Sequence, residues 1–179
     1  IYKKKKQINK YPHDKIVTFI NKYFSKKKNI LKKLVALDLG CGTGNNTKFL
    51  SEYGFGKVIG IDGSISAVKE AKNFLKRNKN CKIMTGDFNN IELKKNSVSV
   101  CIDRGSITHN NKKNIKAILG EVNRVLKSNG IFLSYLFSSN HYAYIKSKNR
   151  FFKKETNSKK GLITSFFSRS EIQNLFKNF

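Results

Sequence analysis

Hydrophobic positions follow two alternating spacings along the chain. Short apolar runs such as Leu34 to Leu37 are typical of strands buried on both faces. Stretches with an apolar residue every three or four positions, such as Ile115 to Leu126, are typical of helices that pack on a sheet. Strands are expected at 34–37, 57–62, 81–86, 98–103 and 131–137, and helices at 11–24, 45–52, 64–77, 115–126 and from about 170. This alternation predicts an α/β fold with a doubly wound, mostly parallel sheet and right-handed crossovers.

The length of 179 residues favours one domain with a single core. We divide this domain, 1–179, into a basic leader with an N-terminal helix at 1–33, a core at 34–137 and a final segment at 138–179 that ends in a helix. Residues 138–161 lack clear periodicity, and a loop of this length is typical of a lid or substrate element. The chain begins at Ile1 and ends on an apolar helical face, which is compatible with a fragment of a longer protein.

A glycine-rich loop, Asp38-Leu39-Gly40-Cys41-Gly42-Thr43-Gly44, follows the first expected strand. In a doubly wound sheet, ligands bind beyond the carboxyl ends of the strands, so this loop is the first candidate site. Its glycines allow the backbone to approach a ligand closely, and the helix expected from Asn45 offers free N–H groups. A dinucleotide fingerprint needs glycine at position 45, so Asn45 argues against a nicotinamide-dependent oxidoreductase.

Three further motifs follow in order along the chain. Gly60-Ile61-Asp62-Gly63-Ser64 ends the second strand, where Asp62 can accept hydrogen bonds from both hydroxyls of a ribose. Gly86-Asp87-Phe88 ends the third strand, and Arg124-Val125-Leu126-Lys127-Ser128-Asn129-Gly130 precedes the last one. With the glycine loop, these motifs resemble those of class I S-adenosylmethionine-dependent methyltransferases, of the type 11/25-like and bacterial kind. The resemblance covers roughly residues 35–137 and leaves the substrate unassigned.

The resemblance implies a Rossmann-like sheet of strand order 3-2-1-4-5. The last two strands usual in the family would be missing from this chain, which would leave the fifth strand as an open edge. The resemblance also implies S-adenosylmethionine as methyl donor and S-adenosylhomocysteine as product. Asp87 would accept a hydrogen bond from the adenine amine, and Phe88 would line the ring pocket. The cofactor-binding residues expected on this basis are Asp38, Gly40, Cys41, Gly42, Gly44, Asp62, Gly63, Asp87, Phe88 and Asp103.

The loop after the fourth strand, residues 103–109, is the expected acceptor site. Methyl transfer is an in-line displacement, so the protein mainly aligns the acceptor and excludes water, with a base when the acceptor is a hydroxyl or a protonated amine. His109 is a candidate general base, with simple packing as the alternative. Asp103 is a candidate to orient the cofactor amine or the acceptor. Arg104 is a candidate to bind an acidic acceptor, with pairing to a surface carboxylate as the alternative.

Two other features bear on the class of acceptor. The loop lacks the N/D-P-P-Y/F motif of enzymes that methylate base amines, which argues against that reaction. His141, Tyr142 and Tyr144 start the long segment and are candidates either to line an acceptor pocket or to pack the lid. The sequence therefore favours transfer to a small-molecule or saccharide-like acceptor.

The chain has 37 basic and 11 acidic residues and a formal charge of +26, which would ordinarily indicate a polyanionic partner. Arginine supplies 5 and lysine 32 of the basic residues, whereas phosphate and base recognition draws heavily on the arginine fork. A solvated lysine surface is therefore the favoured interpretation. An RNA-directed methyltransferase or RNA-binding protein is the alternative, and a cofactor-binding domain without catalysis is a third possibility.

Other classes of protein are disfavoured by what the sequence lacks. It has no run of about 18 apolar residues for a membrane span and no secretory signal, so we expect a cytoplasmic protein. Cys41, Cys81 and Cys101 lie far apart without histidines at metal-ligand spacing, so we expect reduced thiols and no metal site. The oligomeric state is left open.

Overall fold

The computed structural model describes residues 9–142, 151–154 and 162–179. Its core is a five-stranded sheet in the order β3-β2-β1-β4-β5, and every neighbouring pair in it is parallel. The strands are β1 (Val35–Leu39), β2 (Lys57–Asp62), β3 (Cys81–Thr85), β4 (Val98–Arg104) and β5 (Leu126–Tyr135). This order confirms the predicted doubly wound sheet. Among the described residues, no strand pairs with the outer edge of β5.

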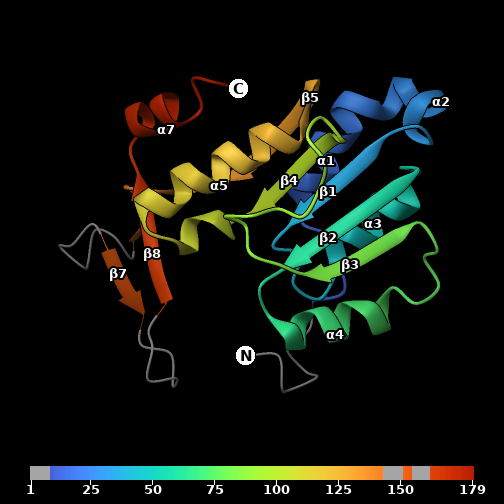
Figure 1. Cartoon of the computed structure of the whole chain (residues 1–179), viewed down its shortest axis with the longest axis horizontal. Helices are drawn as coiled ribbons and strands as arrows, with labels where there is room; N and C mark the ends of the chain where they lie inside the picture. The colour runs from blue at the N-terminus through green and yellow to red at the C-terminus, as the bar shows by residue number, and fades with distance from the viewer. Residues whose placement is uncertain (1–8, 143–150, 155–161) are drawn as a thin grey trace.

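Helices cover both faces of the sheet (Figure 1). They are α1 (Asp14–Phe24), α2 (Lys28–Leu31), α3 (Asn45–Tyr53), α4 (Ile65–Phe74), α5 (Lys112–Val125) and α7 (Arg169–Leu175). On one face, α1 and α3 share an apolar cluster with Ala36 and Val58 of the sheet. On the other, α5 packs against Leu37 and Ile59. Neighbouring residues of one strand thus enter opposite clusters, as buried parallel strands require.

Several predicted boundaries need correction. The stretch 25–33, where the sequence predicted no helix or strand, contains a 3-10 helix (Ser25–Lys27) and then α2, whose Leu31 is buried in the core. Helix α1 begins at Asp14, so Pro12 precedes the helix rather than lying in its first turn. Helix α4 begins at Ile65, which is 77% exposed, and ends at Phe74, three residues before its predicted end.

Strand β5 is longer than predicted, because it begins at Leu126 rather than at Ile131. Its partner on β4 changes from Val98, opposite Leu126, to Val100, opposite Ile131, with a register shift between the two pairs. Residues 127–130 therefore form a bulge in a continuous strand, where the sequence predicted a turn that precedes it.

The C-terminal segment forms a second, three-stranded sheet that the sequence did not predict. Its strands are β6 (Phe137–Ser138), β7 (Phe151–Lys154) and β8 (Leu162–Phe167), in the order β6-β8-β7. Strand β8 is parallel to β6 and antiparallel to β7. The interpretation of 138–161 as one irregular lid is therefore wrong at 151–154. The rest of that lid, including Tyr144, lies largely outside the described residues.

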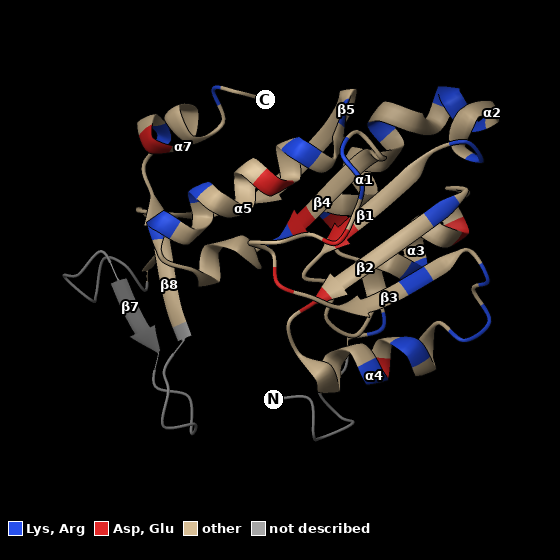
Figure 2. Cartoon of the chain, viewed as in Figure 1, with Lys and Arg blue, Asp and Glu red and all other residues tan. Residues whose placement is uncertain are grey.

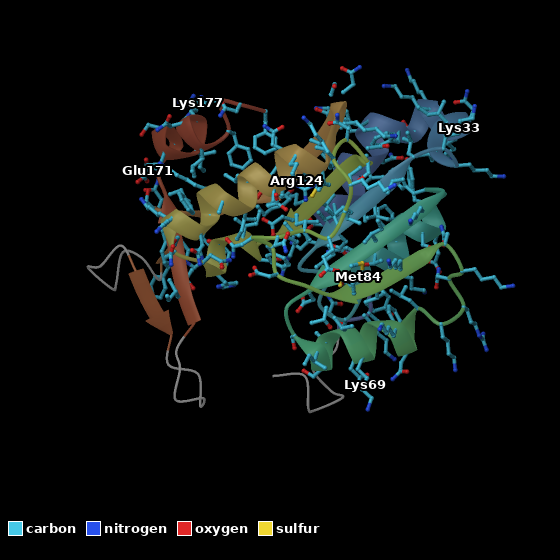
Figure 3. All side chains as sticks on the ribbon, viewed as in Figure 1. Lys33, Lys69, Met84, Arg124, Glu171 and Lys177 are labelled. Carbon is cyan, nitrogen blue, oxygen red and sulfur yellow. The ribbon has the colours of Figure 1, made fainter. Side chains whose placement is uncertain are left out.

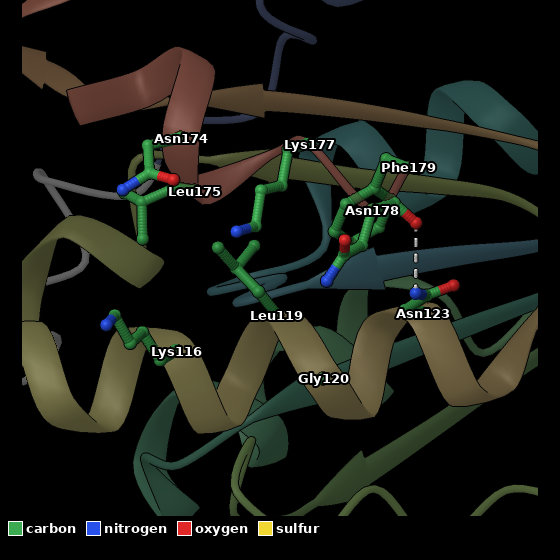
Figure 4. A pocket seen from close by; sticks show the side chains of 9 residues that line it. All are labelled: Lys116, Leu119, Gly120, Asn123, Asn174, Leu175, Lys177, Asn178 and Phe179. Atoms are coloured by element: carbon green, nitrogen blue, oxygen red, sulfur yellow. Dashed lines mark hydrogen bonds between the residues drawn. The ribbon is translucent and has the colours of Figure 1, made fainter. Parts of the chain in front are cut away.

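Helix α7 fixes the end of the chain against α5, close to its predicted position. Ser168 and Glu171 form a capping box at its start, and Glu171 also pairs with Lys112 of α5. Phe176 stacks on Phe132 of β5. A hollow of about 310 Å³ remains between α5 and the end of the chain, where Asn123 Nδ2 donates to the carbonyl of Asn178 (Figure 4). The residues lining this hollow are Lys116, Leu119, Gly120, Asn123, Asn174, Leu175, Lys177, Asn178 and Phe179.

Charged residues are distributed unevenly over this fold. Lysine and arginine are scattered over most helices and connections, whereas acids mark the carboxyl ends of β1, β2 and β4 (Figure 2). Lys33 and Lys69 point away from the sheet (Figure 3). The three cysteines are free thiols. Within the described ranges, no helix is long and apolar enough to cross a membrane.

Candidate functional site

A cleft of about 700 Å³ opens at the carboxyl ends of β1, β2 and β4, a volume typical of small-molecule sites. It brings together most residues of the predicted cofactor and acceptor sites. The lining residues are Asn9, His13, Gly40, Cys41, Gly42, Thr43, Asn45, Asn46, Asp62, Gly63, Ser64, Ser66, Phe88, Arg104, Gly105, Ser106 and His109. Among the described residues, no group of three histidine, cysteine or acidic side chains is arranged to hold a metal ion.

The carboxylate of Asp62 joins the glycine loop to the end of β2. Its Oδ2 accepts a hydrogen bond from the amide of Gly42 at 2.8 Å, and its Oδ1 accepts one from the amide of Ser64 at 2.8 Å. The amides of Gly40 and Cys41 also donate to the carbonyl of Ile61. The loop is thereby fixed in place, with an acidic side chain at the wall of the cleft.

Gly40 shows why this loop needs glycine. Its φ of 75° lies in the left-handed region, and a Cβ there would lie 1.8 Å from Ser106 Oγ. Ser106 Oγ in turn donates to the carbonyl of Leu39 at 3.0 Å. The glycine loop and the predicted acceptor loop are therefore in direct contact.

Asp38 and Gly44, predicted as cofactor-binding residues, do not line the cleft. Asp38 is 1% exposed and accepts a hydrogen bond from Thr47 Oγ1 at 2.6 Å. Burial raises the pKa of the Asp38 carboxyl to about 7. Gly44 adopts a φ of 88° at the start of α3. Asp38 and Gly44 are therefore buried residues that support the glycine loop from the protein interior and do not line the cleft.

Two neighbouring residues of the third motif, Gly86-Asp87-Phe88, lie in different environments. Phe88 lines the cleft, whereas Asp87 is exposed and lies outside the lining. Asp87 Oδ1 accepts from the backbone amide and the side-chain amide of Asn89, each at 2.9 Å, and these hydrogen bonds lower the pKa of Asp87. A contact of Asp87 with adenine stays a prediction.

Asp103 is wholly buried beneath the acceptor loop. Its Oδ1 accepts from the amides of Ser106 and Ile107 at 2.8 and 3.2 Å, and its Oδ2 accepts from Ser134 Oγ at 2.8 Å. Burial raises the pKa of the Asp103 carboxyl. This residue lies outside the cleft lining and supports the loop, which the sequence prediction of a cofactor or acceptor contact did not anticipate.

Arg104 and His109 both line the cleft. Arg104 ends β4 and is exposed. His109 ends a short 3-10 helix (Ile107–His109), and its Nδ1 lies 3.1 Å from Thr164 Oγ1 of β8. Partial burial lowers the pKa of His109 below its ordinary value. Sequence reasoning missed Thr164, because no local pattern links β8 to this loop.

Asn9 and His13, from the segment before α1, also line the cleft, and the sequence did not predict this. The amide of His13 donates to Asn46 Oδ1 at 2.9 Å, and Asn45 Nδ2 donates to the carbonyl of Tyr11 at 2.7 Å. The segment before α1 is therefore tied to the start of α3, directly after the glycine loop. The sequence feature that could have indicated this contact is the asparagine pair at 45–46, whose side chains make both hydrogen bonds.

Two other predicted features lie outside the cleft. Arg124, on α5 (Figure 3), binds both carboxylate oxygens of Glu121 and the carbonyls of Ile91 and Leu93, so its motif holds a connecting loop. His141 stacks on Phe137 at 5.2 Å. Neither His141 nor Tyr142 is among the residues that line the cleft.

Comparison with known proteins gives a consistent result. The profile of the family described as "Methyltransferase domain" matches residues 36–130. An uncharacterised protein of Methanocaldococcus jannaschii is 33% identical over 144 residues, 74% of this chain and 52% of that protein. EEF1A lysine methyltransferase 2 of Homo sapiens is 30% identical over 105 residues, 54% of this chain and 44% of that protein. The chain spans about half the length of these curated relatives.

A solved structure shares the fold. The crystal structure of a protein from Pyrococcus horikoshii superposes with a TM-score of 0.72 at 22% sequence identity. The match covers 97% of this chain and 87% of that one. At this level of identity the likeness establishes the fold alone.

Proposed function

Because this chain belongs to the methyltransferase domain family, we propose that it binds S-adenosylmethionine in the cleft and transfers a methyl group to a small-molecule acceptor. The observation that carries the proposal is the hydrogen bond between Gly42 and Asp62, because it sets a close-approach loop beside a fixed carboxylate. Such a pair suits a ligand with a hydroxylated sugar and an adjoining charged chain.

The residues of the cleft fit this cofactor. Asp62 forms no ion pair with the described residues, so its remaining lone pairs are available to ribose hydroxyls. The side chain of Phe88 offers an apolar wall for a ring. The missing Cβ of Gly40 leaves the acceptor loop in contact with the cofactor loop. When bound, the cofactor supplies an electrophilic methyl group on a sulfonium.

The residues of the chain then act on the acceptor. The acceptor atom attacks the methyl carbon, the carbon–sulfur bond breaks, and its electron pair stays on sulfur. If the acceptor is a hydroxyl, His109 takes its proton, and partial burial, which lowers the pKa of this imidazole, favours the neutral form that can accept it. The loop at 104–106, together with Asn9 and His13, lines the same cleft as the glycine loop and would border the bound acceptor.

Two observations support a small molecule over a macromolecule. The cleft is of small-molecule size, and no lysine is among its described lining residues despite the lysine-rich surface. The +26 charge supports an RNA-directed alternative, and the name of the human relative supports a protein amine as acceptor. These alternatives differ in the class of molecule that would receive the methyl group, which is RNA in the first and protein in the second.

The test uses methyl-labelled S-adenosylmethionine and a cell extract separated into small molecules, protein and RNA. We expect label in the small-molecule fraction and its loss with the Asp62→Ala variant. Label confined to protein or to RNA would overturn the acceptor class. A mobility-shift titration over salt separates true RNA recognition from charge attraction, which disappears near physiological salt.

A further inference from the structure

We propose that the acceptor carries an oxyanion, a carboxylate or a phosphate, and that Arg104 binds this group in the cleft. The inference rests on the proposed function and narrows its substrate class. It follows from the charges that line the cleft, which differ from those of the rest of the molecule.

The basic residues that line the cleft differ in type from those on the rest of the surface. Lysine supplies 32 of the 37 basic residues of the chain, yet the described lining of the cleft contains one arginine, Arg104, and no lysine. Bulk composition would place lysine there far more often than arginine. A guanidinium presents its donors as a planar fork that matches two oxygens of a carboxylate or phosphate, which an ammonium does not.

The guanidinium of Arg104 also has no interaction partner among the described residues. Arg104 ends β4 opposite Tyr135 of β5 and is exposed, and its guanidinium forms no hydrogen bond or ion pair with the part of the chain that the structure describes. Arg124 shows the contrast, because its guanidinium is fully engaged by Glu121 and two carbonyls. The donors of Arg104 are therefore available to a ligand.

No neighbouring acid neutralises Arg104 within the described residues. Asp103 precedes it in β4, but successive strand residues face opposite sides, and both oxygens of Asp103 are bound inside the protein. Asp62 is held by the amides of Gly42 and Ser64. Asp14 lies 3.2 Å from His13 and 4.0 Å from Lys15.

This arrangement disfavours a cationic acceptor. A lysine ammonium in the cleft would meet Arg104, and the one acid among the described lining residues, Asp62, is the proposed partner of the cofactor ribose. An ammonium there would lose its hydration without gaining a carboxylate partner. An anionic acceptor instead gains a charge-assisted, bidentate contact.

The fate of the proton in the chemical step depends on which group of the acceptor is the nucleophile. If the bound carboxylate is itself the nucleophile, its oxygen forms the new bond to the methyl carbon and no proton moves. If a hydroxyl elsewhere on the acceptor is the nucleophile, its proton passes to His109. In both cases the electron pair of the broken carbon–sulfur bond stays on sulfur.

The test is calorimetric titration of the chain saturated with S-adenosylhomocysteine, at fixed ionic strength because the +26 charge attracts any anion. The probes are malonate, inorganic phosphate and neutral malonamide. We expect saturable binding of one or both anions, no comparable binding of malonamide, and a loss of about tenfold or more in the Arg104→Gln variant. Arg104→Lys, which keeps the charge and loses the fork, should recover only part of the affinity. Arg77→Gln, at an exposed surface position, is the matched control and should bind as the unmodified chain does.

The outcomes distinguish failure of the proposed function from failure of the proposed role of Arg104. Failure of the folded chain to bind S-adenosylhomocysteine would contradict the proposed function itself. Binding of S-adenosylhomocysteine with no anion binding, with equal affinity for malonamide, or with anion affinity unchanged in Arg104→Gln, would overturn the role of Arg104. The stronger of the two anions identifies the carboxylate or the phosphate as the recognised group.

Discussion

The amide of Gly42 donates a 2.8 Å hydrogen bond to Oδ2 of Asp62. These residues are twenty positions apart in sequence: Gly42 lies in the loop after β1, and Asp62 is the last residue of β2. The contact turns a flexible glycine loop and an isolated carboxylate into one rigid unit. Most of the proposed cofactor binding depends on this unit.

We therefore expect Asp62→Ala to weaken binding of S-adenosylmethionine about tenfold or more, since it removes the hydroxyl acceptor and frees the loop. A hydrogen bond to a charged group contributes about 1.5 to 3 kcal/mol. Glu92→Ala is the control, because Glu92 is an exposed carboxylate outside the cleft. The measurement is the dissociation constant by calorimetry, and equal losses in the two variants would contradict a specific role.

Gly40→Ala and Gly120→Ala should have opposite effects on stability. At Gly40 a Cβ would meet Ser106 and the φ of 75° is unfavourable for alanine, so we expect a loss of about 1 to 2 kcal/mol or more. At Gly120, in the middle of α5, nothing lies within 4 Å of an added Cβ, so alanine should stabilise by about 0.5 to 1 kcal/mol. Urea unfolding of both variants measures this, and a destabilised Gly120→Ala would count against the packing described around α5.

His109→Gln should lower turnover about 100-fold or more while leaving cofactor affinity within about twofold, if a hydroxyl is the acceptor. Burial lowers the pKa of His109, so the unmodified chain should lose activity only on the acidic side of pH 6.5, and this limb should vanish in the variant. Thr164→Val should reduce turnover without weakening cofactor binding, because it removes the partner of Nδ1, and Thr164→Ser should restore it. The pH profile is measured with an acceptor recovered from the labelled fraction. A retained acidic limb in His109→Gln would exclude this residue as the base.

Asp38 should make the fold less stable as pH rises. Its pKa is raised from 3.8 to about 7, so the native state binds a proton that the unfolded chain releases at lower pH. The associated stability is present below pH 3.8 and is lost as the pH rises towards 7, on the order of 4 kcal/mol in all. Asp38→Asn abolishes this titration, so its stability relative to the unmodified chain should be greater at pH 8 than at pH 4. Urea unfolding at the two pH values checks this, and an effect independent of pH would contradict the assignment.

The sequence predicted the sheet and the glycine loop because their signals are local. Apolar runs and glycine spacing lie within a few residues of each other, and the ends of β1 and β2 follow directly from them. It did not predict which way side chains point at the end of β4, where Asp103 enters the core and the adjacent Arg104 faces the cleft. That choice depends on the register with β1 and β5, which no local pattern records.

The second sheet was missed for a related reason. Strand β8 pairs with β6 and β7, so its stability comes from non-local partners. Through Thr164 and Ser165 it also holds the acceptor loop, because Thr108 Oγ1 donates to the carbonyl of Ser165 at 2.7 Å. The sequence therefore did not reveal the support that this sheet gives to the acceptor loop, nor the contribution of Asn9 and His13 to the cleft.

Calorimetric titration can establish whether the cleft at the carboxyl ends of β1, β2 and β4 is an S-adenosylmethionine site, as we propose. S-adenosylmethionine and S-adenosylhomocysteine are titrated into the chain, with its folding verified by circular dichroism, and a nicotinamide dinucleotide serves as the comparison. We expect saturable one-to-one binding of both sulfur compounds and none of the dinucleotide. Absence of binding by the folded chain, or equal binding of the dinucleotide, would contradict it.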